Sequence, residues 1–204
     1  IPERAFSYAD YQKNILQRIY QAISPHDPEG LLQEEWLNSR GAIARFDRHA
    51  IEIRLLDIQE SPKMDMAVVS TVTSMVQALA EGRWISVERQ MEWHENPLRE
   101  IFLNCMVDGS QATIENDDYL QAFNFPSRGP VKAQELWRHI ASDLLADRRM
   151  QINAYRDEVE FLLKNGCLAS RLVKALGPKP SRDRIASVYR SLCEILAQGG
   201  TFNG

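Results

Sequence analysis

The stretch AIARFDRHAIEIRLLD, residues 42–57, carries the strongest β-strand pattern of this sequence. It contains two short apolar runs, at residues 42–46 and 50–57, separated by Asp47-Arg48-His49. Two such runs joined by a short polar connection are typical of a β-hairpin. We therefore predict a hairpin over residues 42–57.

Side chains in the second run alternate with the period of a strand that has one apolar face. Three apolar residues share that face: Ile51, Ile53 and Leu55. We expect this face to point into the core. Glu52 and Arg54 then lie side by side on the opposite face, together with Leu56.

Most of the remaining chain has the 3.6-residue spacing of amphipathic helices. Helices are predicted at residues 8–23, 61–79, 87–106 (in two pieces, interrupted at Pro97), 131–150, 151–163, 168–176 and 181–197. The helix at 61–79 starts at Ser61-Pro62, and we expect its stripe of Val68, Val72, Met75, Val76 and Leu79 to be buried. A single hairpin among many helices predicts an α+β fold rich in helix.

The segment Asn124–Pro130 is rich in Pro, Gly and Ser and is the best candidate for an internal linker. It divides the chain into residues 1–125, which hold the hairpin and the long helix, and a helical subdomain at 126–204. The tail after Gln198-Gly199-Gly200 is expected to be frayed.

Composition excludes several classes of protein. The formal net charge is −4 over 204 residues, which argues against a general electrostatic grip on nucleic acid or on an anionic membrane. The longest uncharged stretch, Met66 to Ala80, is too short and too polar for a membrane span. Three widely spaced cysteines, Cys105, Cys167 and Cys193, indicate neither a disulfide framework nor a zinc site. We expect a cytoplasmic protein.

Charged residues gather on and beside the hairpin: Arg45, Arg48, Glu52, Arg54 and Asp57. One interpretation is an ordinary strand with a solvated face of alternating charges. The other is a site for a metal and an anion, because a carboxylate can bind Mg²⁺ and arginine offers bidentate contacts to phosphate or carboxylate. Spacing alone leaves both interpretations open.

Residues Leu37–Asp57, followed by the helix at Ser61–Leu79, resemble the glutamate–cysteine ligase (carboxylate–amine ligase) family, which is related to glutamine synthetase. In that superfamily a late strand of the form Glu-x-Arg-x-x-Asp precedes a long apolar helix. The resemblance implies that Glu52 binds the metal and that Arg54 is a catalytic, anion-binding arginine. It also implies that the chain is the helix-rich C-terminal half of a glutamine synthetase-like catalytic domain.

The family usually has an arginine two positions before the glutamate, where this sequence has Ala50. Arg48, as a further catalytic residue, and Arg45, as a residue that binds ATP, fill that role by hypothesis. The implied reaction joins a carboxylate, the γ-carboxylate of glutamate, to an amine through an acyl phosphate, with ATP as substrate and Mg²⁺ as cofactor. Glutathione biosynthesis is the implied context.

The family's other metal carboxylates lie on earlier strands. The first residue is Ile1 rather than Met, and we expect a missing N-terminal portion of the same protein as a partner. Whether the protein forms a homo-oligomer is left open. The rival interpretation is a non-catalytic helical module that binds another protein, with the hairpin serving only to nucleate the fold.

Overall fold

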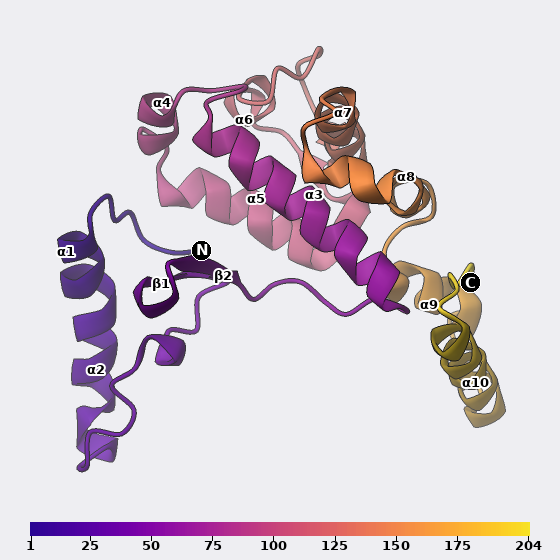
Figure 1. The fold of residues 1–204 in the computed structure, drawn as a ribbon, viewed down its shortest axis with the longest axis horizontal. Helices are drawn as coiled ribbons and strands as arrows, with labels where there is room; N and C mark the ends of the chain where they lie inside the picture. Colours follow the sequence, from indigo (N-terminus) through magenta and orange to yellow (C-terminus); the bar gives the residue numbers. More distant parts are fainter. The chain divides into compact units, whose positions relative to one another are not determined.

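The computed structural model describes residues 1–204, which form two compact units. Unit 1 comprises Ile1–Asp57 and Glu88–Leu103, and unit 2 comprises Ile58–Val87 and Asn104–Gly204. The chain is rich in helix and contains two small antiparallel sheets, β1-β2 and β3-β4, so the α+β class is confirmed (Figure 1). The division predicted at residue 125 stays a prediction.

Unit 1 begins with one continuous helical stretch made of α1 (Tyr8–Tyr11), a π-helical turn (Gln12–Leu16) and α2 (Gln17–Ile23). Ser7 caps it, because its hydroxyl accepts a hydrogen bond from the backbone N–H of Asp10 at 3.1 Å. A 3₁₀ turn containing Pro25 follows Ile23. The helix predicted at residues 8–23 is confirmed.

The predicted hairpin is also confirmed, with shorter strands than expected. Strand β1 (Ala42–Arg45) pairs antiparallel with β2 (Ala50–Ile53), and a 3₁₀ turn at Phe46–Arg48 connects them. His49 closes the connection in the left-handed region, with φ of 51°. Residues 54–57 lie outside the strand.

The face of the hairpin that is buried is the opposite of the predicted one. Ile43 pairs with Glu52 and so shares the charged face, and Ile43 is only 2% exposed. Ile51 and Leu55 are 64% and 56% exposed, so the expectation that they face the core is wrong. The reason is that the first helix and residues 34–38 lie over the charged face, where Tyr11 accepts a hydrogen bond from the Ala44 N–H at 3.1 Å.

Two further helices follow the long helix in sequence, α4 (Val87–Met91) and α5 (Glu95–Asp108), as two pieces were predicted. The expected interruption at Pro97 is wrong, because Pro97 lies in the first turn of α5 and the break falls at residues 92–94. A helix tolerates proline in its first turn, where the N–H groups have no partner within the helix.

Unit 2 is built around α3 (Pro62–Ala80), which packs against α7 (Ala133–Ala146), α8 (Arg156–Asn165) and the 3₁₀ turn Gln151–Tyr155. The predicted long helix is confirmed, but its buried face is different. Its buried residues are Met64, Ala67, Ser70, Ser74 and Ala78, whereas Val76 of the predicted stripe is 40% exposed. Small side chains allow the neighbouring elements to approach α3 closely, and the Ser74 hydroxyl accepts a hydrogen bond from the buried Ile152 N–H at 3.0 Å.

A second two-stranded sheet, β3 (Thr113–Ile114) with β4 (Val131–Lys132), leads into α7, and α6 (Asp117–Gln121) lies between the two strands in sequence. The stripe predicted for α7 is confirmed, since Leu136, Ile140 and Leu144 are all buried. The linker predicted at Asn124–Pro130 connects α6 to β4 as an irregular segment.

The C-terminal helices α9 (Leu168–Leu176) and α10 (Arg182–Gln198) share a small apolar core formed by Ala175, Val188 and Phe202. Phe202 is 5% exposed, so the expectation of a frayed tail is wrong. Its N–H donates to Glu60 at 3.1 Å and its carbonyl accepts from Arg171. Glu60 and Arg171 are buried and form a two-armed ion pair with distances of 2.5 and 2.9 Å.

Candidate functional site

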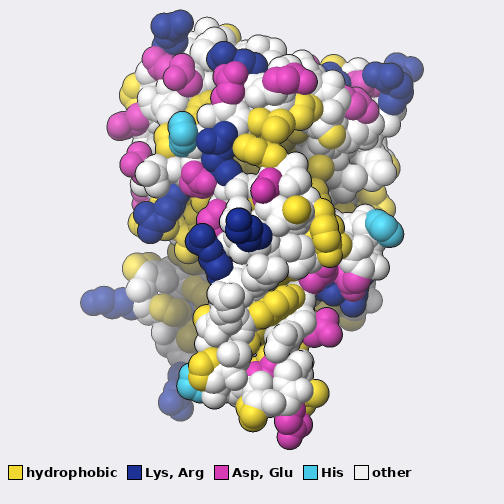
Figure 2. All heavy atoms as spheres, turned by 90° about the vertical axis from the view of Figure 1, so that its left-hand side faces the viewer, with side chains coloured by type: hydrophobic (Ala, Val, Ile, Leu, Met, Phe, Trp, Pro, Cys, Tyr) yellow, Lys and Arg dark blue, Asp and Glu magenta, His cyan; other side chains and the backbone are white.

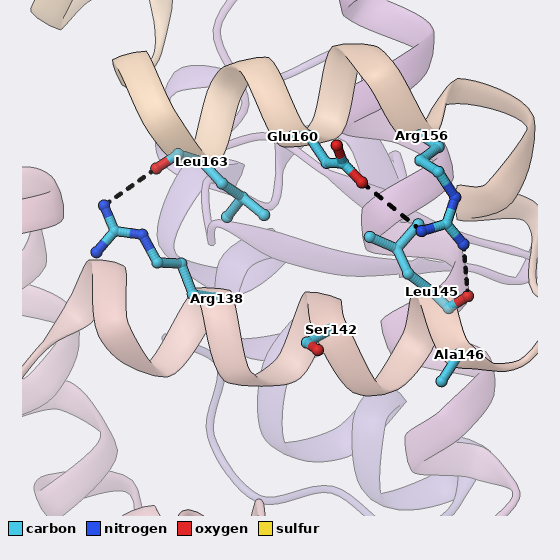
Figure 3. A pocket seen from close by; sticks show the side chains of 7 residues that line it. All are labelled: Arg138, Ser142, Leu145, Ala146, Arg156, Glu160 and Leu163. Carbon is cyan, nitrogen blue, oxygen red and sulfur yellow. Dashed lines mark hydrogen bonds and ion pairs between the residues drawn. The ribbon is translucent and has the colours of Figure 1, made fainter.

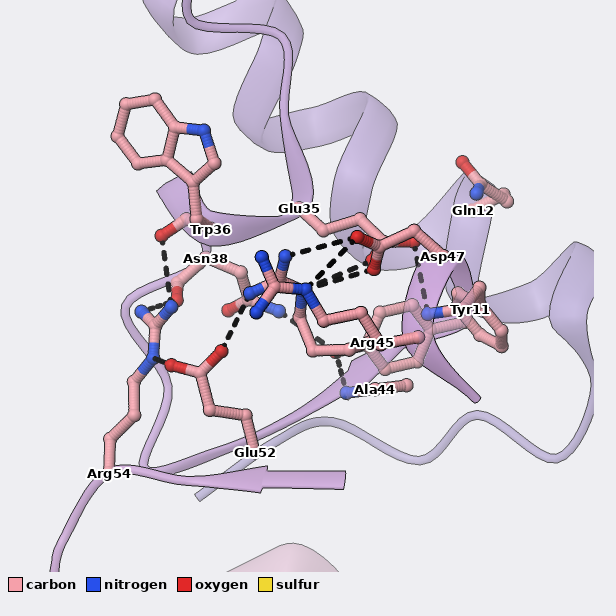
Figure 4. Close-up of polar contacts among 12 residues, drawn as sticks. Tyr11, Gln12, Glu35, Trp36, Asn38, Ala44, Arg45, Asp47, Glu52 and Arg54 are labelled. Carbon is pink, nitrogen blue, oxygen red and sulfur yellow. Dashed lines mark hydrogen bonds and ion pairs between the residues drawn. The ribbon is translucent and has the colours of Figure 1, made fainter. Parts of the chain in front are cut away.

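The predicted charged face of the hairpin is an arginine–carboxylate network with Glu52 at its centre (Figure 4). One Glu52 oxygen accepts a hydrogen bond from Arg45 Nη1 at 2.8 Å, and the other accepts one from Arg54 Nε at 2.7 Å. These two arginines lower the pKa of the Glu52 carboxyl, Arg54 most strongly. The structure therefore brings three of the four predicted site residues together.

Arg45 extends the network to two more carboxylates. Its guanidinium lies 3.3 Å from Asp47 and 3.4 Å from Glu35, and its side chain is only 11% exposed. Hydrogen bonds to Glu52 and then to Asp47 raise the pKa of Arg45. Arg45 is thus a cation held among three acidic side chains.

Arg54 ties the hairpin to the preceding segment. Besides Glu52, it donates to the carbonyl oxygens of Asn38 and, at 3.2 Å, of Trp36. Asn38 is itself fully buried, and its amide donates to the Tyr11 hydroxyl at 2.9 Å. Arg54 therefore holds residues 36–38 against the strand while it binds Glu52.

Arg48 does not contact Glu52 and reaches the network only through Asp47. It lies in the connecting turn, its side chain is 68% exposed, and its contact is with Asp47 at 3.4 Å. Its catalytic role stays a prediction, and it requires a ligand that reaches over the turn.

Two members of the network, Glu35 and Asp47, were not predicted as site residues. Burial and a hydrogen bond with Asp47 raise the pKa of the Glu35 carboxyl, whereas the hydrogen bond from Arg45 lowers the pKa of Asp47. Glu35 also accepts a hydrogen bond from the Phe46 N–H at 3.3 Å. The acidic pair Glu34-Glu35, just before Trp36, was the signal in the sequence that could have pointed to this residue.

The geometry restricts what this network can bind. Each oxygen of Glu52 already accepts one hydrogen bond from an arginine, so a cation that binds Glu52 either competes with a guanidinium group or lies beside it. An anion that binds Arg45 or Arg54 must compete with the carboxylates that these arginines contact. No group of three or more His, Cys, Asp or Glu side chains is arranged to hold a metal ion.

A shallow groove of about 440 Å³ lies between α7 and α8 in unit 2 (Figure 3). Its two arginines are engaged with backbone carbonyls near helix ends: Arg156 donates to Leu145 at 2.8 Å and Arg138 to Leu163 at 3.3 Å. Cations near the C-terminal carbonyls of helices stabilise those ends, and we assign both arginines this structural role.

The protein surface carries no dominant charge on the face shown in Figure 2, where acidic and basic side chains are mixed and hydrophobic side chains reach the surface between them. No helix of the structure has both the length and the apolar character needed to cross a membrane.

Comparison with known proteins gives a partial match to this chain. No family model matches it, and no solved structure matches it. An uncharacterized protein of Archaeoglobus fulgidus is 38% identical over 81 residues, which make up 40% of this chain and 22% of that protein. The matched part of the chain thus spans about a fifth of that relative's length, and the relative carries no stated function.

Proposed function

We propose that this chain is part of an ATP- and Mg²⁺-dependent carboxylate–amine ligase of the glutamate–cysteine ligase type, with a glutamine synthetase-like catalytic domain. The observation that supports the proposal is the position of the Glu52 carboxylate between the guanidinium groups of Arg45 and Arg54. A carboxylate can bind Mg²⁺, and a neighbouring arginine can bind the phosphate oxygens of a nucleotide that carries this metal. The segment that carries the family resemblance forms a hairpin and a long helix, although β2 ends at Ile53, so that Arg54 and Asp57 lie outside the strand.

Each residue has a distinct role in this proposal. Glu52 offers carboxylate oxygens, the ligands Mg²⁺ prefers, and Mg²⁺ would supply neutralisation of phosphate charge. Arg54 and Arg48 would bind the transferred phosphoryl group, and Arg45 would bind the phosphates of ATP. In this proposal the nucleotide phosphates compete with Glu52 for the N–H groups of Arg45 and Arg54.

The reaction and its biological context are part of the same proposal. A γ-glutamyl amide formed through an acyl phosphate needs a carboxylate substrate, an amine and ATP, but no protein nucleophile. Arginines and Mg²⁺ then act by positioning and by neutralising developing charge. Glutathione biosynthesis in the cytoplasm, and a further portion of the polypeptide that completes the metal site, belong to this proposal.

One observation favours the rival function, a non-catalytic module that binds another protein. Both oxygens of Glu52 accept hydrogen bonds within the fold, and both terminal nitrogens of Arg54 donate to backbone carbonyls. These contacts fasten residues 36–38 to the hairpin, which is the role that a non-catalytic module requires of them. The two functions differ in whether the network opens for a ligand.

Substitutions in the full-length protein separate the two functions. Glu52→Gln keeps the shape and removes the charge, and Arg54→Lys keeps the charge and removes the bidentate fork. We expect each to lower ATP-dependent ligation by about 10²–10³-fold, the cost of removing one electrostatic contact to a transition state. Glu29→Gln and Arg182→Lys, at exposed positions outside the network, are matched controls and should leave the rate unchanged.

The measurement is phosphate release from ATP with glutamate and an amine, titrated with Mg²⁺. Unchanged turnover and unchanged Mg²⁺ dependence in both site variants would contradict the ligase proposal. The rival function would then be favoured.

A further inference from the structure

The guanidinium group of Arg54 is held by three acceptors. Its Nε donates to Glu52 at 2.7 Å, and its terminal nitrogens donate to the carbonyl oxygens of Asn38 and Trp36 (Figure 4). Because a guanidinium group is planar, these contacts fix both its position and the direction of its other N–H groups. A residue that fixes the Asn38 carbonyl therefore also sets the direction of Arg54.

Asn38 is fixed through its side chain, which is fully buried. The amide nitrogen donates to the Tyr11 hydroxyl at 2.9 Å. The amide oxygen accepts hydrogen bonds from the backbone N–H and from Nη1 of Arg40, at 3.2 and 3.1 Å. Both ends of the amide are thus bonded, and a buried polar group that is satisfied in this way favours a single arrangement.

The Tyr11 hydroxyl connects three elements of unit 1. It lies on the first helix, accepts the hydrogen bond from Asn38, and accepts a second one from the Ala44 N–H of β1 at 3.1 Å. All residues of this chain of contacts, from Tyr11 to Arg54, belong to unit 1. The hydroxyl therefore holds Asn38 in register with the hairpin next to Arg54.

Tyr8, on the same helix, separates the role of the ring from that of the hydroxyl. The rings of Tyr8 and Tyr11 both pack edge to face against Phe46, with centroids 4.6 and 5.4 Å away. The Tyr8 side is exposed to solvent, and its hydroxyl accepts a hydrogen bond from Gln12 of the same helix at 2.8 Å. Removing the Tyr8 hydroxyl is therefore a matched control for removing that of Tyr11.

We infer that Tyr11 and Asn38 are positioning residues for Arg54: the Tyr11 hydroxyl holds the Asn38 amide, and the Asn38 carbonyl directs the guanidinium group toward the anion that it binds. Both residues act through Arg54 rather than on the anion itself. The inference rests on the proposed function for the identity of that anion, the transferred phosphoryl group.

NMR of ¹⁵N-labelled arginine side chains in the full-length protein tests this arrangement without turnover. In the parent protein Arg54 should give separate signals for its two terminal nitrogens, because its hydrogen bonds slow the rotation of the guanidinium group. Tyr11→Phe should speed the exchange of the Arg54 Nε–H with solvent by about tenfold, the effect of one lost hydrogen bond. Tyr8→Phe should leave this rate unchanged.

Kinetics of the full-length protein test whether Tyr11 acts through Arg54. Tyr11→Phe should lower kcat by about tenfold and leave the KM for ATP unchanged, since Arg54 is present but less well directed in the transition state. The double variant Tyr11→Phe, Arg54→Lys should be no slower than Arg54→Lys alone. A role of Tyr11 in general stability would instead give losses that multiply.

Three results would overturn the inference. Averaged signals from the terminal nitrogens of Arg54 in the parent protein would show that the group is not held, and this measurement needs no variant to fold. Equal Nε–H exchange in the parent and in Tyr11→Phe would show that the hydroxyl does not hold Arg54. Losses that multiply in the double variant would show that Tyr11 acts independently of Arg54. A parent protein without ligation would contradict the ligase proposal, whereas the NMR measurements would still decide the positioning of Arg54.

Discussion

Replacing Arg171 with methionine should destabilise unit 2 by about 3–5 kcal/mol, the usual cost of leaving one partner of a buried ion pair alone. The side chains of Arg171 and Glu60 are 1% and 0% exposed. Arg171 also donates to the carbonyls of Gly166, at 3.0 Å, and Phe202. Methionine fills a similar volume, so the loss comes from the unpaired Glu60 carboxylate and from carbonyls without donors.

The double variant Arg171→Met, Glu60→Met tests whether the charge is the cause. Removing both partners leaves no buried charge, and a large part of the lost stability should return. Urea unfolding followed by far-UV circular dichroism measures the free energy of unfolding for the parent, each single variant and the double variant. A loss below about 1 kcal/mol for Arg171→Met, or a double variant as unstable as the sum of the singles, would refute the reasoning.

The same ion pair has a defined pH dependence. Burial alone raises the pKa of Glu60, but hydrogen bonds from Arg171 and from the backbone outweigh it, and the pKa lies below its ordinary value. The folded state therefore binds the proton less tightly than the unfolded state does. The stabilisation by the Glu60–Arg171 ion pair is complete at pH values above about 4.3, the pKa of a glutamate in the unfolded chain. It is lost as the pH falls through the lower pKa of Glu60 in the folded state. Glu60→Gln should flatten this part of the stability curve.

Three further outcomes are expected. Ser74→Ala should cost about 1–3 kcal/mol in urea unfolding, because it leaves the buried Ile152 N–H without an acceptor, and a loss near zero would contradict that role. Phe202→Ala should destabilise the α9–α10 pair by about 3–5 kcal/mol, seen as faster hydrogen exchange in α10, whereas a tail that contributes nothing would leave exchange unchanged. The 204-residue chain alone should release phosphate from ATP at background rate with glutamate and cysteine, and robust turnover would refute the need for further metal ligands.

Helix positions could be predicted from the sequence where start signals and periodicity agree. Ser61-Pro62 and Ser181 mark the starts of α3 and α10, and both helices begin at the next residue. Pro97 shows the limit of this reasoning, because proline marks a break in the interior of a helix but is accommodated in the first turn. The sequence does not state which of the two positions it occupies.

The buried faces were harder to predict. Alternation identifies two faces of β2 but does not say which one the first helix covers, and charges that neutralise one another can lie on the covered face. In α3 the contacts fall on Ala67, Ser74 and Ala78, since small residues let neighbouring elements come close. A hydrophobicity pattern favours the larger Val76, which remains 40% exposed.

Only those residues of the candidate site that are close together in the sequence could be predicted to lie together. Glu52 and Arg54 are two positions apart, and the predicted period of two places them together, although β2 ends at Ile53. Glu35 is seventeen positions before Glu52, and only the folding of residues 34–38 over the hairpin brings it to Arg45. Long-range contacts of this kind leave no periodic signal in a single sequence.

The exposure of Glu52 makes the functional test decisive. Its side chain is 37% exposed, and ion pairs that reach solvent contribute little to folding because water screens them. Glu52→Gln still offers an oxygen to Arg45 or Arg54, so residues 36–38 should stay in place. A large loss of ligation in this variant, with an unchanged unfolding midpoint, would therefore report a lost contact to the ligand rather than a damaged fold. An unchanged rate would mean that the network only fastens the hairpin to the segment before it.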